Sequence, residues 1–306
     1  MEDRGHLTTE RPNAASEWLD RLSIDRAFEV INGADAVVAA AVGGAKREIC
    51  RAIEVVTAAF ERGGRLIYVG AGTSGRLGVL DAAECPPTFC SDPNMVVGVI
   101  AGGDAALRRS IEGAEDRQED GAAAVGGLAV SERDVVFGIT TGGTTPYVHG
   151  ALMEARRRGA KTVFLACVPE GEVGDSADVS IRVLTGPEVL TGSTRMKAGT
   201  ATKMVLNMVT TIAMTRIGKV YGNLMVDVHT RANAKLVDRG IRIVRDVTGL
   251  SRQEAAALLE KAEGRVKSAL VMHARNVGRL DAERLLSDAG GHLHRILPER
   301  TADERG

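Results

Sequence analysis

The stretch Leu66–Arg76 reads LIYVGAGTSGR and joins an apolar strand to a glycine loop that carries two hydroxyls. Glycines let a backbone approach a ligand closely and adopt dihedral angles that other residues avoid. We expect a helix to begin near Arg76 and to direct unpaired amides and a partial positive charge at the loop. The stretch therefore predicts a phosphate site in which Gly72, Thr73 and Ser74 contact the anion.

The same stretch satisfies G-x-G-x-x-G, the pattern of dinucleotide-binding loops. Two features argue against a dinucleotide. Thr73 and Ser74 add hydroxyl donors that a pyrophosphate loop does not need, and the next strand is followed by Gly102 and Gly103 before the first acid, Asp104. A phosphorylated small molecule is the better interpretation, and an NAD-dependent dehydrogenase is the weaker alternative.

Composition limits the class of protein. The chain has 306 residues and a net charge of −1, so it lacks the broad positive charge that nucleic-acid binding requires. Its 4 cysteines form no C-x-x-C pair, which fits a reducing compartment, and its 6 histidines include only one close pair. We expect no apolar run long enough to cross a bilayer. These features predict a cytoplasmic protein with no metal, no cofactor, and no nucleic-acid or membrane partner.

Short β-branched runs alternate with helical patterns through the middle of the chain. Several runs are continuously apolar, and most intervening segments are long enough for crossover helices. Together they predict an α/β fold with a doubly wound, five-stranded parallel sheet flanked by helices. Ligands bind beyond the carboxyl ends of strands in such sheets, so the loops at Gly70, Gly102, Thr141 and Val168 should meet there. The expected strands are residues 65–69, 95–100, 134–140, 161–167 and 179–184.

Helical patterns flank the expected sheet. Residues 15–47 are alanine-rich, with Ser23 placed as an N-cap, and we expect packing helices there. Residues 196–217 predict a long helix that ends at Gly218. Its apolar residues recur three and four positions apart, which indicates a face that packs on the core. These residues are Met204, Val205, Met208, Val209 and Ile212.

The chain divides by pattern into three parts. We expect an N-terminal helical segment at 1–50, the sheet domain at 51–232 and a small C-terminal helical module at 233–306. Within that module, Ser251 and Glu254 form a capping-box pattern. We expect its helices to end near residue 298 and the remaining tail to be frayed.

Two further clusters repeat the chemistry of the first loop. Thr140–Pro146 follows the third expected strand, and Thr191–Lys197 lies where the long helix starts. Ser193 alone is read equally well as an ordinary N-cap. Three hydroxyl-rich clusters on one sheet edge nevertheless strengthen the phosphate interpretation. The candidate contacts in these two clusters are Thr141, Thr145, Ser193, Thr194 and Lys197.

Longer motifs carry a resemblance to a known family. The matching segments are Gly70–Thr88, Ile111–Asp116, Thr145–Tyr147, Thr191–Thr200 and Tyr221–Asp227. With them, nearly the whole chain resembles the sugar isomerase (SIS) phosphosugar-binding fold and, within it, the N-acetylmuramic acid 6-phosphate etherase family. The second half of the first segment separates these etherases from general sugar-phosphate isomerases. The resemblance implies a phosphosugar substrate, a homodimer with sites near the subunit interface, and a ubiquitin-associated-like (UBA-like) C-terminal module.

The resemblance also implies a reaction, in which the D-lactyl ether of N-acetylmuramic acid 6-phosphate is cleaved by elimination of lactate and addition of water. Such chemistry needs an acid and a base and no redox cofactor. Glu84 and Glu115 match the family's catalytic pair, with Glu84 as the acid at the ether oxygen and Glu115 as the base at C2. Judged from the residues alone, both are ordinary exposed helix glutamates. Glu112 lies one turn before Glu115 and is the decoy.

The chain departs from the family pattern at two loops. Gly142 and Thr144 stand where relatives carry serine and arginine, and Val168 replaces an asparagine. These changes remove a hydroxyl, a cation and an amide from the expected site. Two other functions remain open, a noncatalytic sugar-phosphate sensor and an aldose-ketose phosphosugar isomerase.

Overall fold

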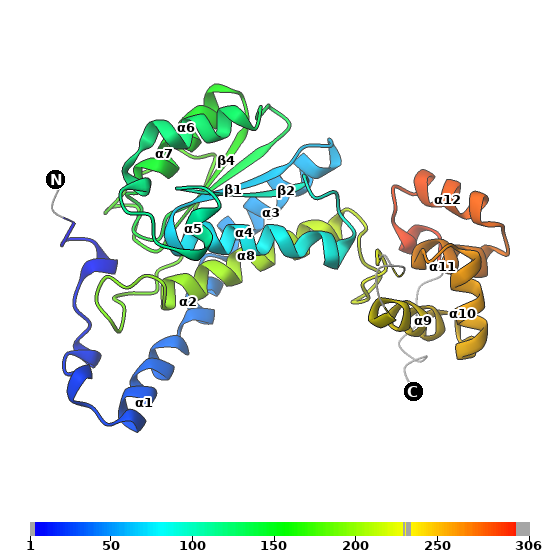
Figure 1. Cartoon of the computed structure of the whole chain (residues 1–306), viewed down its shortest axis with the longest axis horizontal. Coiled ribbons are helices and arrows are strands. Elements are labelled where there is room, and N and C mark those ends of the chain that lie inside the picture. Colours follow the sequence, from blue (N-terminus) through cyan, green and yellow to red (C-terminus); the bar gives the residue numbers. More distant parts are fainter. Residues whose placement is uncertain (1–3, 229, 231–233, 298–306) are drawn as a thin grey trace. The chain divides into compact units, whose positions relative to one another are not determined.

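The computed structural model describes residues 4–228, 230 and 234–297 (Figure 1). The chain divides into two compact units, residues 1–83 with 93–211 and residues 84–92 with 212–306. Each unit contains a buried apolar cluster of its own.

The first unit contains the expected parallel sheet, which confirms the prediction from β-branched runs. The strands are β1 (Leu66–Gly70), β2 (Val96–Ile100), β3 (Val135–Ile139), β4 (Lys161–Ala166) and β5 (Val179–Arg182). They pair in parallel in the order β2-β1-β3-β4-β5. The winding direction therefore reverses between β1 and β3, and a ligand crevice is expected at the carboxyl ends of strands at such a point.

Helices cover both faces of the sheet (Figure 1). On one face, Ile67, Val136 and Phe164 pack in an apolar cluster with Val148 and Leu152 of α7. The helices whose bounds position the site are α3 (Lys46–Glu61), α4 (Gly72–Phe89), α5 (Ala105–Arg108), α6 (Gln118–Gly127), α7 (Pro146–Arg157) and α8 (Lys197–Arg216). On the other face, a Cβ placed on Gly78 of α4 would lie 2.9 Å from the Cβ of Tyr68, so this helix needs glycine to approach β1.

Helix α4 begins earlier than expected. It starts at Gly72, two residues after β1, because Gly72 adopts a left-handed φ of +52° and turns the chain directly into the helix. Pro86 and Pro87 lie near its C-terminal end, and the helix continues past them to Phe89. Each proline lacks the N–H that would bond to the preceding turn, and its ring crowds the carbonyl there, so both weaken this end of the helix.

The first N-terminal helix is exposed, which corrects the expectation that it packs on the core, whereas the second buries Val38 and Val42. Helix α1 (Ile24–Asp35) has no buried residue, although Ser23 caps it as expected through the amide of Arg26. Helix α2 (Val38–Gly44) follows at once. The segment Ile24–Gly44 has a mean hydropathy of 1.3 over its most apolar window, which is 11% buried. By length and composition alone it reaches the size of a membrane span, so the expectation of no such run is wrong. One such helix near the N-terminus remains a weak sign of a membrane span.

Helix α8 confirms the long helix; it ends at Arg216, two residues before Gly218, which has φ +82°. Its buried face differs from the face that the pattern predicted. Val205 and Val209 are fully buried together with Leu206 and Met214, whereas Met208 is 37% and Ile212 42% exposed. Apolar spacing indicates which residues share a helix face, but it does not fix which part of that face the neighbouring elements cover.

Helices build the second unit around an apolar cluster that includes Val244, Leu259 and Leu270. The capping box of Ser251 and Glu254 is present as expected. The expected start of this region at Asn233 and its expected frayed tail at 299–306 lie outside the described residues. The helices are α9 (Ala234–Thr248), α10 (Arg252–Lys261), α11 (Val266–Arg275) and α12 (Arg279–Asp288), and the bounds confirm a C-terminal helical region.

Candidate active site

The loop between β1 and α4 presents free hydroxyls beside helix-terminal amides. Thr73 and Ser74 lie in the first turn of α4, and neither hydroxyl forms a hydrogen bond within the described residues. Close packing beneath them requires glycine, because a Cβ at Gly75 would lie 2.6 Å from Ile100 Cγ1 and 2.7 Å from the Gly70 carbonyl oxygen. The first amides of a helix lack partners within the helix and carry partial positive charge. The loop therefore has the donors and the field that a phosphate group needs.

The cluster at the start of α8 lies beside this first loop. A Cβ at Gly199 would lie 3.6 Å from Thr73 Cγ2 and 3.4 Å from the Thr194 carbonyl oxygen. Ser193 and Thr194 are half-buried, and within the described part of the chain their hydroxyls make no hydrogen bond. The structure thus brings the first and third predicted clusters together.

Lys197 points into the protein. Its side chain is 5% exposed, and its Nζ donates to the Thr185 carbonyl oxygen over 2.8 Å. Its backbone amide and that of Ala198 donate to the carboxylate of Glu188, which is fully buried. Glu188 thereby caps α8, and no local pattern marks it as a cap because it lies nine residues before the Lys197 amide that it binds.

The loop between β3 and α7 bonds mainly to itself. The hydroxyls of Thr140 and Thr145 lie 2.8 Å apart in a hydrogen bond, and the Thr145 amide also donates to Thr140 Oγ1. His149 Nε2 lies 2.7 Å from the Gly143 carbonyl oxygen. Thr141 is half-buried, and its hydroxyl has no hydrogen bond inside the described ranges. Of the two threonines proposed from the sequence, Thr141 is free and Thr145 is engaged.

The N-terminal segment lies against the second and third clusters. A Cβ on Gly142 would lie 3.7 Å from Thr9 Oγ1, and a Cβ on Gly192 would lie 2.9 Å from Glu10 Oε2. Thr9 is fully buried, and its hydroxyl has no partner among residues 4–228, 230 and 234–297. This segment therefore forms part of the site's wall, which spacing along the chain did not predict.

The two candidate catalytic glutamates are exposed. Glu84 lies on α4, the helix that the first loop opens. Glu115 lies in a single 3-10 turn, η4 (Ala114–Asp116), after Gly113 with φ +73°. Arg76 of α4 donates to backbone carbonyl oxygens of residues 107 and 109, so the chain leading to Glu115 is tied to the first loop's helix. Both carboxylates are therefore held on ordered backbone and open to a substrate.

The chain is similar over nearly its whole length to N-acetylmuramic acid 6-phosphate etherases. The N-acetylmuramic acid 6-phosphate etherase of Synechocystis sp. is 54% identical over 297 residues, which cover 97% of each chain. The etherase of Synechococcus elongatus is 57% identical over 293 residues, covering 96% of this chain and 95% of the relative. The chain belongs to the N-acetylmuramic acid 6-phosphate etherase family. The model of the glucokinase regulatory protein N-terminal SIS domain matches residues 48–156 of this etherase-family chain, and the SIS domain model matches residues 118–212.

Solved structures with similarity to this etherase-family chain include two phosphoheptose isomerases. The one from Neisseria gonorrhoeae has a TM-score of 0.45 at 18% identity and covers 61% of this chain and 98% of its own. The one from Francisella tularensis has a TM-score of 0.45 at 19% identity and covers 63% of this chain and 96% of its own.

A buried carboxylate lies on α4 close to Glu84. Asp81 is 6% exposed and accepts hydrogen bonds from Tyr68 Oη at 3.0 Å, Asn207 Nδ2 at 2.8 Å and Thr210 Oγ1 at 3.3 Å. Burial raises the pKa of Asp81, and these hydrogen bonds oppose the increase. The carboxylate therefore joins α4 to β1 and α8 one helical turn before Glu84.

Among the described residues, no group of three or more His, Cys, Asp or Glu side chains is arranged to hold a metal ion.

Proposed function

We propose that this chain cleaves the D-lactyl ether of N-acetylmuramic acid 6-phosphate to give N-acetylglucosamine 6-phosphate and D-lactate, in amino sugar recycling. The observation that carries the proposal is the 54–57% identity to etherases over nearly the full length of both chains. The free hydroxyls at the sheet edge supply the phosphate site that such a substrate requires.

The chemistry proceeds through the open-chain sugar. Its aldehyde makes the C2 proton acidic, so a base can remove that proton and the ether oxygen at C3 can leave as D-lactate. Water then adds to C3 of the unsaturated intermediate. We assign Glu115 as the base at C2 and Glu84 as the acid at the ether oxygen, each contributing ~10²–10⁴-fold.

The phosphate group is assigned to the first and third clusters. The Gly72 region and the hydroxyls of Thr73 and Ser74 bind its oxygens, with Ser193 and Thr194 in support, because these hydroxyls have no other hydrogen-bond partner among the residues that the structure describes. Three further predicted residues act at the site's edges. Thr141 offers a free hydroxyl, Thr145 holds the second loop, and Lys197 holds the start of α8.

A homodimer is proposed from the apolar residues that this single chain leaves exposed. Phe28 is 66%, Val37 51%, Leu80 50% and Met208 37% exposed. A second copy of the chain would cover such side chains, since large exposed apolar patches mark contact surfaces. We expect light scattering to give a dimer that Phe28→Asp weakens, and a wild-type monomer at all concentrations would contradict the proposal.

The cytoplasm is the proposed compartment, because all four cysteines are free thiols.

Isotope exchange separates the two glutamate roles. In heavy water, Glu84→Gln should exchange the C2 proton of the substrate for deuterium without releasing lactate, because its base is intact. Glu115→Gln should do neither. Glu112→Gln is the matched control, since Glu112 is an exposed neighbour whose carboxylate accepts from Ser110, and it should retain activity. Normal lactate release by both Glu84→Gln and Glu115→Gln would contradict the assignment.

The position of bond cleavage is tested in heavy-oxygen water. Elimination followed by addition places label at C3 of the sugar and none in lactate. Fragmentation of the sugar in the mass spectrometer distinguishes C3 from the anomeric oxygen, which exchanges with water on its own. Label in lactate would mean that water attacks the lactyl carbon.

A further inference from the structure

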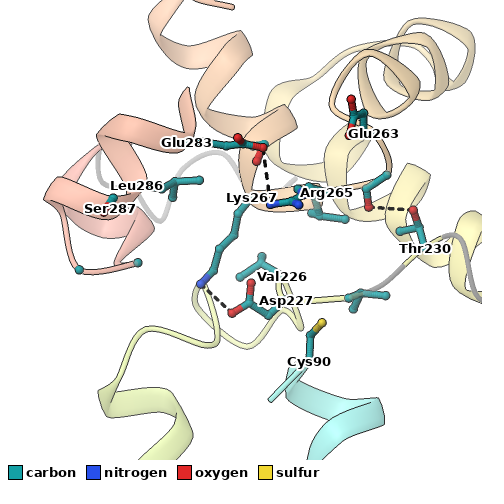
Figure 2. A pocket seen from close by; sticks show the side chains of 16 residues that line it. Cys90, Val226, Asp227, Thr230, Glu263, Arg265, Lys267, Glu283, Leu286 and Ser287 are labelled. Atoms are coloured by element: carbon teal, nitrogen blue, oxygen red, sulfur yellow. Dashed lines mark hydrogen bonds and ion pairs between the residues drawn. The ribbon is translucent and has the colours of Figure 1, made fainter. Parts of the chain in front are cut away.

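The charged groups of the cavity in the second unit already have partners within the protein. This cavity has a volume of about 800 Å³, and Figure 2 shows the side chains that line it. Lys267 Nζ lies 2.8 Å from Asp227, and Arg265 lies 3.5 Å from Glu283. The remaining acid of the wall, Glu263, lies 3.4 Å from an arginine of α12. The charges of this cavity therefore do not call for a ligand, in contrast to those of the N-terminal segment.

The N-terminal segment is anchored to loops at the carboxyl edge of the sheet. The Thr8 amide and hydroxyl donate to the two carboxylate oxygens of Glu172 over 2.7 and 2.6 Å. The Ser16 hydroxyl donates to the Val189 carbonyl oxygen over 2.7 Å. Glu172 lies in the loop that follows β4, and Val189 lies beyond the end of β5. The segment is thus held in place at the edge of the sheet where the candidate site lies.

The two side chains that follow Thr8 lie against the loops of the site. Thr9 and Glu10 belong to the same 3-10 turn, η1 (Thr8–Glu10), and their side chains lie next to Gly142 and Gly192. Thr9 Oγ1 is buried and has no hydrogen-bond partner within the described ranges, which is uncommon in a native protein and lowers stability. The half-buried Glu10 carboxylate likewise forms no hydrogen bond or ion pair with the described residues. The fold therefore satisfies the anchoring residue of this turn and leaves the two residues at the site unsatisfied.

The Glu10 carboxylate is open toward the third cluster. The three atoms nearest to a Cβ placed on Gly192 all belong to this carboxyl group, and the nearest, Oε2, would lie 2.9 Å away. Glycine at this position, with φ +74°, leaves that side of the carboxylate uncovered. Gly192 directly precedes Ser193, one of the hydroxyls assigned to the substrate. A ligand at the third cluster therefore meets an acceptor that the fold has not used.

A carboxylate at this place favours the uncharged part of a phosphosugar. An ionised carboxylate accepts hydrogen bonds and donates none, and it repels the negative charge of a phosphate group. A sugar hydroxyl suits it, because a hydrogen bond to an ionised acceptor is about twice as strong as a neutral one. The start of α4 provides the partial positive charge that suits the phosphate. The two features therefore bind different groups of one substrate.

We propose that Glu10 is a substrate-binding residue, whose carboxylate accepts a hydrogen bond from a hydroxyl group of the open-chain phosphosugar. This role rests on the proposed function for the class of substrate. Thr8 and Arg11 hold the turn through Glu172, so the carboxylate is fixed beside the third cluster before the substrate binds. The N-terminal segment thereby supplies selectivity for a sugar phosphate over free phosphate.

Direct binding to the full-length protein tests this role without turnover. The probe is D-glucitol 6-phosphate, which carries the hydroxyls of an open-chain sugar but neither the aldehyde nor the lactyl ether, and inorganic phosphate is the reference. Titration calorimetry should show that wild type binds glucitol 6-phosphate more tightly than phosphate. Glu10→Gln should weaken the binding of glucitol 6-phosphate about fivefold or more, because the acceptor loses its charge, and Glu10→Ala about tenfold or more. Neither variant should weaken the binding of inorganic phosphate.

Glu17→Gln is the matched control, since it removes the same charge from an exposed residue of the same segment and should leave both dissociation constants unchanged. The inference is overturned if wild type binds the two ligands equally, if both Glu10 variants keep the wild-type constants, or if they weaken both ligands alike. Lactate release by wild type is a separate readout of the proposed reaction. Release without the Glu10 effect would contradict this inference alone, and the Glu10 effect without release would contradict the proposed reaction alone.

Discussion

The first and second glycine loops share a sequence logic but differ in structure. Each follows a buried strand next to the point where the sheet reverses its winding, and each carries glycines and hydroxyls. In the first loop, Thr73 and Ser74 have no hydrogen-bond partner within the described residues. In the second, Thr140 and Thr145 bond to each other. Loops of similar composition therefore differ: the hydroxyls of the first are open to a ligand, and two hydroxyls of the second already hydrogen-bond to each other.

The distance from strand to helix explains this difference. Helix α4 starts two residues after β1, so its own first turn carries the hydroxyls. Helix α7 starts at Pro146, seven residues after β3 ends at Ile139, and the backbone between them needs partners of its own. The side chains of Thr140 and His149 provide those partners.

Removal of both first-loop hydroxyls should have the largest effect. We expect Thr73→Val/Ser74→Ala to lower kcat/KM for the phosphorylated substrate about 100-fold or more, since two hydrogen bonds to a charged group are lost. The free energy of unfolding should stay within about 0.5 kcal/mol of wild type, because these hydroxyls form no hydrogen bond in the described part of the chain. Lactate release and urea unfolding measure the two quantities. An unchanged KM would show that the phosphate binds elsewhere.

Glycine-to-alanine substitutions should destabilise the tightly packed first loop more than the second. Gly75→Ala should lower the free energy of unfolding by about 1–3 kcal/mol, because its Cβ would overlap Ile100 and the Gly70 carbonyl. Gly142→Ala should change it by less than about 0.5 kcal/mol, since the nearest atom, Thr9 Oγ1, is at an ordinary contact distance of 3.7 Å. Urea unfolding of the two variants makes the comparison. Equal destabilisation would mean that the loops are packed alike.

A substitution in the second loop should change the stability of the protein and not its binding of substrate. We expect Thr145→Val to lower the free energy of unfolding by about 1 kcal/mol, because the hydrogen bond between the Thr140 and Thr145 hydroxyls is lost. Its kcat/KM should stay within about threefold of wild type, which corresponds to less than about 1 kcal/mol. Steady-state kinetics and urea unfolding test both statements. A tenfold loss of kcat/KM with unchanged stability would place Thr145 on the substrate.

The helix behind the first loop should make the stability of the protein depend on pH. Helix α4 carries the buried Asp81, whose pKa is raised, mainly by burial. As pH rises above its ordinary pKa, the unfolded chain loses this proton before the folded chain does. The unfolding free energy of wild type should therefore fall relative to Asp81→Asn, until pH exceeds the folded pKa. Urea unfolding at a series of pH values measures this difference, and a constant or rising difference would contradict it.

Much of the sheet could be predicted from sequence because buried parallel strands are short β-branched runs. The position of the helix start could not, since Gly72 reaches it through a left-handed φ that the letters permit but do not require. The exposure of α1 could not be predicted either, because an amphipathic pattern does not show which other element packs against the helix.

The sequence predicted which clusters of residues lie at the candidate site, but not which contacts their side chains make. Glycine and hydroxyl patterns pointed to all three loops, and the family resemblance selected Glu84 and Glu115 as candidates. The direction of Lys197 depends on Thr185 and Glu188, which the chain brings to it from outside the cluster. The hydrogen bond between Thr140 and Thr145 depends on loop geometry that a string of letters does not contain.

The claim that the first loop holds the phosphate is tested most directly by comparing inhibition by N-acetylglucosamine 6-phosphate and by N-acetylglucosamine. The ratio of the two inhibition constants isolates the contribution of the phosphate group. It should fall about 100-fold or more in Thr73→Val/Ser74→Ala and stay at the wild-type value in Thr145→Val. A ratio that survives in the first-loop variant, or falls in the second-loop variant instead, would contradict the claim.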